Sequence, residues 1–281
     1  MAFYRINILA DNFVKRPKLK AEHGFSALIQ SALSNVLFDT GVDGLFRDNA
    51  AAMKIELYGI DAIVLSHGHY DHTGGLDTAL TVAPKSRLYF HPAGEQPKFS
   101  RAADGASLRE IGLSELSRRA LATAREEGRV TALPEPVWQL APGMTLFRLP
   151  QGALRSPQWP FFRAESDGRL VPDPFEEEQS LLLEGDDSAL LLTGCSHCGL
   201  MPIVARAVEI SRRPIRYILG GTHLDNAADN LLEETATYLR RFDADFYFGH
   251  CTGMNGYAKL FSRLGGRLLP LGVGLELDLN L

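Results

Sequence analysis

"LSHGHYDHTGGL", residues 65–76, is the stretch that decides how this chain is interpreted. It places His67, His69, Asp71 and His72 within six positions, although the 281-residue chain has only eight histidines. Neutral imidazole is the commonest metal ligand in proteins, and carboxylate often accompanies it around zinc, iron or manganese. His67 and His69 are two residues apart, so in extended backbone their side chains point the same way. Asp71 and His72 follow after a turn, which indicates a second set of ligands and a two-metal site.

The histidine loop starts where a continuous apolar run, residues 60–66, ends. Such a run is typical of a strand buried on both faces, and catalytic groups commonly lie on loops at strand ends. Three later histidines, His197, His223 and His250, also follow apolar runs. Because strand ends of the same sense meet at one edge of a layered α/β fold, we expect these histidines to converge on the loop.

The composition excludes several classes of protein. Hydrophobic residues make up 45% of the chain and charged residues 22%, as in ordinary globular proteins. A net charge of −5 without a basic run predicts no nucleic-acid partner. We find no apolar stretch of about 18 residues and no signal-peptide pattern, so we expect no membrane segment and a cytoplasmic location. Three cysteines are too few, and odd in number, for a disulfide framework. The oligomeric state stays open.

The pattern of elements predicts a single domain over residues 1–281. Short β runs dominate the first third, and strands alternate with helices in the last third. The middle, at about 92–173, combines one expected helix with several proline and glycine breaks, so we interpret it as an irregular insertion or lid around a site. Four arginines of this segment are candidates for binding phosphate or are solvated surface groups: Arg101, Arg109, Arg155 and Arg163.

Five further motifs accompany the histidine loop: "EHGFSALI" (22–29), "LFDTG" (37–41), "LLTGCSHCG" (191–199), "GGTHL" (220–224) and "GHCTG" (249–253). The loop itself resembles the H-x-H-x-D-H signature of the metallo-β-lactamase superfamily. Together the motifs resemble its 7,8-dihydropterin-6-yl-methyl-4-(β-D-ribofuranosyl)aminobenzene-5′-phosphate synthase-like subfamily. The resemblance extends over nearly the whole chain and is weakest in the middle. It implies an α/β fold, an αββα sandwich of two mixed sheets flanked by helices, with a dinuclear site at its rim.

The resemblance also implies metal ligands and a cofactor. The expected cofactor is a pair of divalent ions, zinc first, with iron or manganese as alternatives. The superfamily pattern assigns His67 and His69 to the first metal, and assigns Asp71, His72 and His250 to the second.

The remaining positions depart from that pattern. Cys195 stands where a bridging aspartate is expected, and is either a ligand or a small buried residue. His197 is our choice for the missing ligand of the first metal, and Glu178 competes for that role. His223, a subfamily feature, is either a ligand or a group that holds or protonates the substrate. His197 and His223 could each also be structural, and His23 is a possible pocket group.

Asp39, in "DTG", needs its own interpretation. A single such motif does not indicate an aspartic protease, because the second copy is absent. We expect its carboxylate to accept a hydrogen bond from the outer nitrogen of a ligand imidazole. His91 is interpreted as structural.

The function implied by the resemblance is that of a dinuclear metal-dependent hydrolase, in which a metal-bound hydroxide attacks a small-molecule substrate such as a phosphoester or lactone. The family label points to a pterin and phosphoribosyl-type substrate, which fold and metal site alone do not determine. Asp71 and His223 are the expected catalytic residues. One alternative is a metal-bound sensor or ligand-binding protein with little turnover. Another is a thiol redox protein using Cys195 and Cys198, since strand, C-x-x-C and helix is also a redox-site layout.

Overall fold

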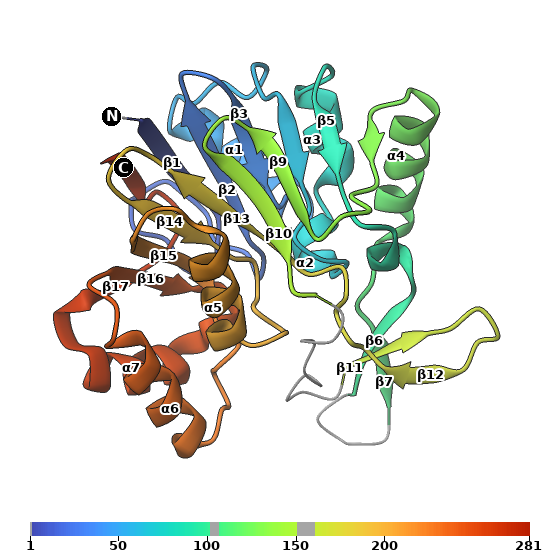
Figure 1. Cartoon of the computed structure of the whole chain (residues 1–281). Helices are drawn as coiled ribbons and strands as arrows, with labels where there is room; N and C mark the ends of the chain where they lie inside the picture. The colour runs from blue at the N-terminus through green and yellow to red at the C-terminus, as the bar shows by residue number, and fades with distance from the viewer. Residues whose placement is uncertain (1, 102–106, 151–160) are drawn as a thin grey trace.

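Two mixed β-sheets lie face to face in the computed structural model, and helices cover the outer face of each sheet (Figure 1). The structure describes residues 2–101, 107–150 and 161–281. This layering confirms the predicted αββα sandwich. Side chains fill three apolar layers, one between the sheets and one under each set of helices.

The first sheet has the strand order β18-β1-β2-β3-β4-β5-β8 within the described residues. Pairing is antiparallel from β18 to β3 and parallel from β3 to β8. Helices α1 (Leu45–Ala52), α3 (Leu76–Val82) and α4 (Glu115–Glu126) cover its outer face. Its strands are β1 (Phe3–Ala10), β2 (Ser26–Ser31), β3 (Asn35–Phe38), β4 (Ala62–Val64), β5 (Arg87–Tyr89), β8 (Val130–Thr131) and β18 (Glu276–Asn280).

The second sheet has the order β17-β16-β15-β14-β13-β10-β9 within the same residues. Strands β14 to β17 are parallel, and β9, β10 and β13 are antiparallel to their neighbours. Its strands are β9 (Val137–Ala141), β10 (Met144–Arg148), β13 (Gln179–Glu184), β14 (Ala189–Leu192), β15 (Ile215–Gly221), β16 (Asp245–Gly249) and β17 (Leu268–Pro270).

Helices α5 (Leu200–Ile210), α6 (Asp229–Leu239) and α7 (Gly253–Leu264) cover the outer face of the second sheet. Each has one apolar face, which packs on the sheet through residues such as Val204, Leu232 and Leu260. The longest helices of the described chain, α4 and α7, have 12 residues, and none is long and apolar enough to cross a membrane.

Alternation along the strands explains how one short segment serves two layers. In β3, Val36 and Phe38 point into the layer between the sheets, whereas Leu37 packs under the helices. Successive side chains of a strand point to opposite faces, so a strand covered on both sides must be apolar throughout. The run Ala189–Leu192 is fully buried for the same reason. Continuous apolar runs in this sequence therefore mark the central strands.

The middle segment, expected to be an irregular insertion, divides between two parts of the fold. Its helix α4 and strands β8 to β10 join the sandwich. Four further strands form a separate sheet in the order β12-β11-β6-β7, which extends from the sandwich at the lower right of Figure 1. Its strands are β6 (Lys98–Arg101), β7 (Leu108–Glu110), β11 (Phe161–Ala164) and β12 (Leu170–Pro172). The division of the chain into domains stays a prediction.

The last apolar run, residues 267–279, divides between the two sheets. Its first part is β17 in the second sheet, and its last part is β18 in the first sheet. Gly274, at φ 88°, allows the left-handed turn between them, a conformation that other residues rarely adopt. The chain therefore crosses from one sheet to the other within a few residues.

Candidate metal centre

Four strand ends meet at one rim of the sandwich. The histidine loop follows β4 and leads into the short helix α2 (Tyr70–Thr73). Cys195 and His197 follow β14, His223 follows β15, and His250 follows β16. Because β14, β15 and β16 are parallel, their carboxyl ends lie side by side. The structure thus brings the predicted histidines together.

Two groups of three donors form at this rim. In the first, His67, His69 and His197 place their ligand atoms within 4.8 Å of one another. The Nε2 atoms of His67 and His197 are 3.2 Å apart. In the second group, the ligand atoms of Asp71, His72 and His250 likewise lie within 4.8 Å of one another. The Nε2 atoms of His72 and His250 are 3.0 Å apart, and Asp71 Oδ2 lies 3.5 Å from His250 Nε2. All six residues are buried.

Cys195 lies between the two groups. Its Sγ is 3.1 Å from His72 Nε2, and it forms a further candidate set with His67 and His72. It also has ligand-distance neighbours in His223 and Cys251. The side chain is 2% exposed. Cys195 therefore occupies the place that a ligand shared by two ions would need.

The outer nitrogens of three imidazoles have hydrogen-bond partners. His72 Nδ1 lies 2.7 Å from Asp39 Oδ2, His250 Nδ1 lies 3.1 Å from Asn12 Oδ1, and His67 Nδ1 lies 2.9 Å from Ser66 Oγ. Asp39 also accepts from the backbone N–H and the hydroxyl of Ser66. A proton held at Nδ1 leaves the lone pair at Nε2 facing the cluster, the arrangement of metal-binding histidines. The placement of Asp39 is the one expected, whereas Ser66 and Asn12 were not predicted.

The donors fit divalent ions chemically. Burial, with neighbouring imidazoles, lowers the pKa of His67, His69, His197 and His250 well below the usual value, so these rings are neutral and can donate lone pairs. His69 Nε2 is buried without a hydrogen-bond partner among the described residues. An orphaned polar atom of this kind is costly unless something else binds it, and a metal ion would.

Four residues at the same rim have strained backbone. Asp39, Ser196, His223 and His250 have φ values of 61°, 59°, 53° and 48°, in the left-handed region that residues other than glycine seldom adopt. Such conformations cost on the order of 1–3 kcal/mol each and persist where the surroundings enforce them. The strained backbone therefore lowers the stability of the fold, and it orients these four side chains.

The other predicted site residues take different places. The Glu178 carboxylate accepts the backbone N–H groups of His197 and Cys198, at 2.6 and 2.7 Å, so it holds the loop that carries His197. His23 is largely exposed, with Nε2 3.5 Å from Asp71 Oδ2. His223 is half-buried and lies within ligand distance of Cys195 and His197. His91 lies outside the candidate donor groups and accepts the N–H of Ala93.

A buried ionic group next to the candidate metal centre was not predicted from the sequence. Lys98 Nζ is fully buried, 2.5 Å from Asp173 and 2.7 Å from Glu177. Although burial lowers it, the pKa of Lys98 is raised by Glu177 and Asp173. Glu177 also lies 3.4 Å from the N–H of Gly68, in the histidine loop. The one available signal was the acidic run at residues 176–178, which is unusual beside a buried strand.

A pocket of about 170 Å³ opens above the donors. The separate sheet supplies one wall through Ser100, Arg109 and Phe161, and the floor includes His69, Asp71 and Cys195. Arg109 lies over the Tyr70 ring at 5.0 Å, which leaves its guanidinium at the pocket wall.

The remaining candidate arginines are differently placed. Arg163 pairs with Glu176 at 2.6 Å, and Arg101 lies 5.2 Å from the centre of the Phe162 ring. Arg155 lies outside the described residues. Of the four arginines proposed for phosphate binding, Arg109 is the one that lines the pocket above the donors in the described chain.

Residues 19–199 match the family model of the metallo-β-lactamase superfamily. This chain belongs to the metallo-β-lactamase superfamily. The match covers the histidine loop, β14 and the "GCSHC" segment. Both the fold and the family inferred from the motifs are thereby confirmed.

Individual proteins that this metallo-β-lactamase superfamily member resembles are consistent with the family assignment. It is 30% identical to the uncharacterized protein MJ0448 of Methanocaldococcus jannaschii, over 91% of this chain and 93% of that one. It is 29% identical to the 7,8-dihydropterin-6-methyl-4-(β-D-ribofuranosyl)-aminobenzene-5′-phosphate synthase of the same organism, over 83% and 82%. Among solved structures, Tm1679, a metal-dependent hydrolase of the β-lactamase superfamily, is 26% identical, with a TM-score of 0.84 and 99% coverage of both chains.

Proposed function

We propose that this protein is a dinuclear metal-dependent hydrolase that acts on a small molecule such as a phosphoester or a lactone. The observation that carries the proposal is the pair of adjoining donor groups, with Cys195 between them and with His69 Nε2 lacking a hydrogen-bond partner in the described part of the chain. The family supports a metal-dependent reaction, and Tm1679 is described as a metal-dependent hydrolase. Zinc is the first candidate metal, because imidazole, carboxylate and thiolate together suit it.

Bound divalent ions would supply a nucleophile from water at neutral pH and neutralise charge on the substrate. The protein's own groups have separate tasks. Asp71 Oδ2, at 3.5 Å from both His23 and His250, lies in the floor of the pocket and can orient the attacking water. His223 lines the wall and can deliver a proton to the leaving-group oxygen.

The pocket walls suit a substrate with both a charge and an apolar part. The guanidinium of Arg109 can pair with a phosphate or carboxylate at the mouth. Phe161 packs against His69 and His197, with ring centroids 5.3 and 5.1 Å apart, and limits the access of bulk water. A small-molecule partner is therefore proposed.

A thiol redox function receives less support from the geometry. Cys198 Sγ faces the carbonyl oxygens of Phe175 and Pro174, at 3.5 and 3.8 Å, whereas Cys195 Sγ faces His72. Burial raises the pKa of Cys198, the opposite of what a reactive cysteine needs. A metal-bound sensor would use the same donors as a hydrolase, so a measurement of turnover is needed to distinguish the two functions.

Metal content and turnover, measured on the same preparation, test the proposed function. Purification without chelator should give about two divalent ions per chain by elemental analysis, as a two-metal site requires. The protein should hydrolyse at least one of bis(4-nitrophenyl) phosphate, a γ-lactone and a thioester, and chelation should stop this. Fewer than one ion per chain overturns the proposal. Two ions with no hydrolysis in any of the three assays favours the sensor.

We expect the Cys195 thiolate to be a ligand of the bound metal ion. We expect protein reconstituted with Co²⁺ to show near-ultraviolet thiolate-to-metal charge-transfer absorption, because Cys195 Sγ lies among the donor nitrogens. Cys195→Ser should abolish this band. Cys198→Ser is the matched control and should retain it, since Cys198 faces backbone carbonyls. A band that survives in Cys195→Ser but disappears in Cys251→Ser would assign the thiolate to Cys251 instead.

A further inference from the structure

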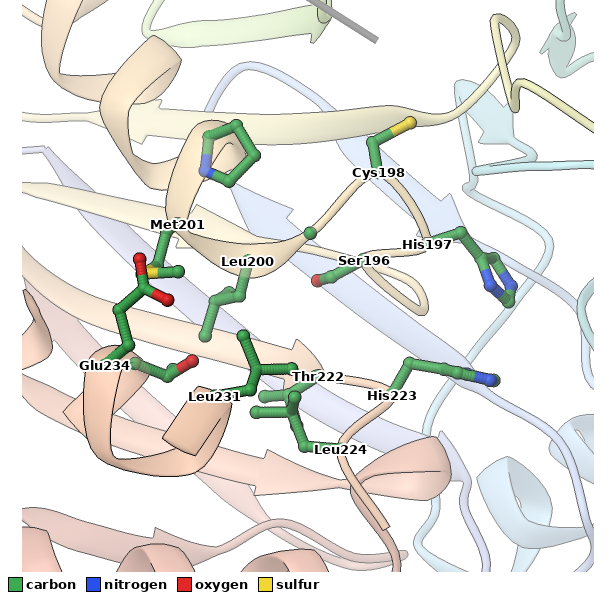
Figure 2. A pocket seen from close by; sticks show the side chains of 13 residues that line it. Ser196, His197, Cys198, Leu200, Met201, Thr222, His223, Leu224, Leu231 and Glu234 are labelled. Atoms are coloured by element: carbon green, nitrogen blue, oxygen red, sulfur yellow. The ribbon is translucent and has the colours of Figure 1, made fainter. Parts of the chain in front are cut away.

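A second pocket of about 160 Å³ lies between the start of α5 and one face of α6. Figure 2 shows His197 and His223 at one end, with Met201 and Glu234 at the other. Leu231 lies between these ends. The arrangement gives the pocket an inner end at the metal centre and an outer end at the protein surface.

The inner end is shared with the catalytic pocket. His197 and His223 line both, so the two spaces meet at these imidazoles. His197 belongs to the first donor group, and His223 is the proposed proton donor. A molecule with its reacting bond over the donors can therefore extend past His223 into the second pocket.

The walls are mainly apolar. Leu200, Leu224 and Leu231 contribute aliphatic side chains, and Met201 adds a flexible thioether. A cavity of about 150 Å³ lined by such residues accepts a benzene ring. The size and lining therefore suit one flat or branched ring-sized group.

The outer end carries a negative charge that nothing in the described chain neutralises. Glu234 is exposed and has no hydrogen-bond or ion-pair partner among the described residues, whereas its neighbour Glu233 pairs with Arg240 and Arg263. Inside the pocket, the Thr222 hydroxyl is engaged with Thr252. A ligand's N–H donors would therefore find their acceptor at Glu234.

We propose that this second pocket binds the non-reacting part of the substrate, a ring-sized apolar group that carries a cationic or N–H-donating substituent toward Glu234. This inference rests on the proposed hydrolase function and deepens it. The substrate then has two unlike ends. Arg109 holds an anionic end near the metal centre, and Leu231 and Glu234 select the group at the other end.

Methionine methyl signals can test this without turnover. The chain has five methionines, and Met201 is the one in the pocket, while Met144 is buried between the sheets and Met254 is exposed at the start of α7. We would label the methionine methyl groups with ¹³C in the metal-loaded protein and titrate it with benzamidine, a ring bearing an amidinium. The Met201 signal should move and saturate, and the Met144 signal should stay in place.

Two variants make the result specific. Leu231→Trp fills the pocket, and Glu234→Gln removes its charge. Leu231→Trp should weaken benzamidine binding about tenfold or more because the indole occupies the pocket. Glu234→Gln should weaken it by about two- to fivefold, the factor that loss of an exposed ion pair gives. Leu116→Trp and Glu126→Gln, at positions of α4 outside the pocket, should bind as the wild type does.

The outcomes separate this proposal from the proposed function. A Met201 signal that does not respond, or responds equally in Leu231→Trp, overturns the pocket assignment even if the protein binds two ions and hydrolyses a model ester. A saturable Met201 response that both variants weaken supports the pocket. If that response occurs in protein holding less than one ion per chain, the pocket stands and the hydrolase proposal fails.

Discussion

His69→Ala should reduce hydrolysis by about 10³-fold or more and lower the metal content, because water without its full metal site stays protonated at neutral pH. Among the donors, His69 is the residue whose substitution gives the clearest test. Its Nε2 is buried without a partner among the described residues, so its removal breaks no hydrogen bond that the structure contains at that atom. Elemental analysis and turnover of the most active model substrate, measured on one preparation, give both numbers.

The control for His69→Ala is a histidine outside the donor groups. His91 Nδ1 accepts the N–H of Ala93 at the start of a short 3-10 helix, η1 (Pro92–Glu95), and asparagine can cap in the same way. His91→Asn should therefore keep its metal and its activity. A His69→Ala protein that folds normally and retains both ions and more than a tenth of wild-type activity would contradict the assignment of the first donor group.

Lys98→Met should lower the free energy of unfolding by about 3–5 kcal/mol, the range found when one partner of a buried ion pair is removed. Lys98 is fully buried between Asp173 and Glu177, so methionine would leave two carboxylates close together without a cation. Chemical denaturation of metal-free and metal-loaded protein measures the effect. The loss should appear in both states because the group lies beneath the donors and is not among them.

Two further variants test the cause of the Lys98 effect. Lys98→Met with Glu177→Gln should be more stable than Lys98→Met alone, since only one buried carboxylate remains. Lys259→Met breaks an exposed pair with Asp229 and should leave the free energy of unfolding close to that of the wild type. If Lys98→Met unfolds within 1 kcal/mol of the wild type, the ionic group does not support the histidine loop.

Much of the fold was predictable because the signals were local. The run at residues 60–66 becomes a strand and the loop after it, and the apolar runs ending before Cys195, His223 and His250 become three parallel neighbours. These elements depend on hydrophobic periodicity, which neighbouring residues determine. The local pattern of residues 267–279 does not indicate that a glycine-rich turn divides this run between the two sheets.

The residue types of the site could be predicted from their positions in the sequence, whereas their grouping was predicted from the family resemblance and not from spacing. His67 and His69 are joined by His197, which is 128 residues beyond His69, and no spacing rule connects them. Glu178 competed with His197 for that place until its carboxylate was found on the backbone of the His197 loop. Long-range pairing of this kind depends on how two sheets stack, which the sequence expresses only weakly.

The sequence by itself determined that this chain carries a metal-type donor loop, because the donors of that loop are close together in the chain, and the resemblance of its motifs to a family implied the αββα scaffold. Only the tertiary structure decided that the Cys195 Sγ, at the position expected of a bridging ligand, lies 3.1 Å from His72 Nε2 and within ligand distance of donors from both groups. It likewise decided that Lys98 pairs with Glu177 next to Gly68 of the loop and that Arg109 reaches the pocket wall. The physical reason is that these contacts join segments from different layers, where packing and charge, acting over space, select the partners.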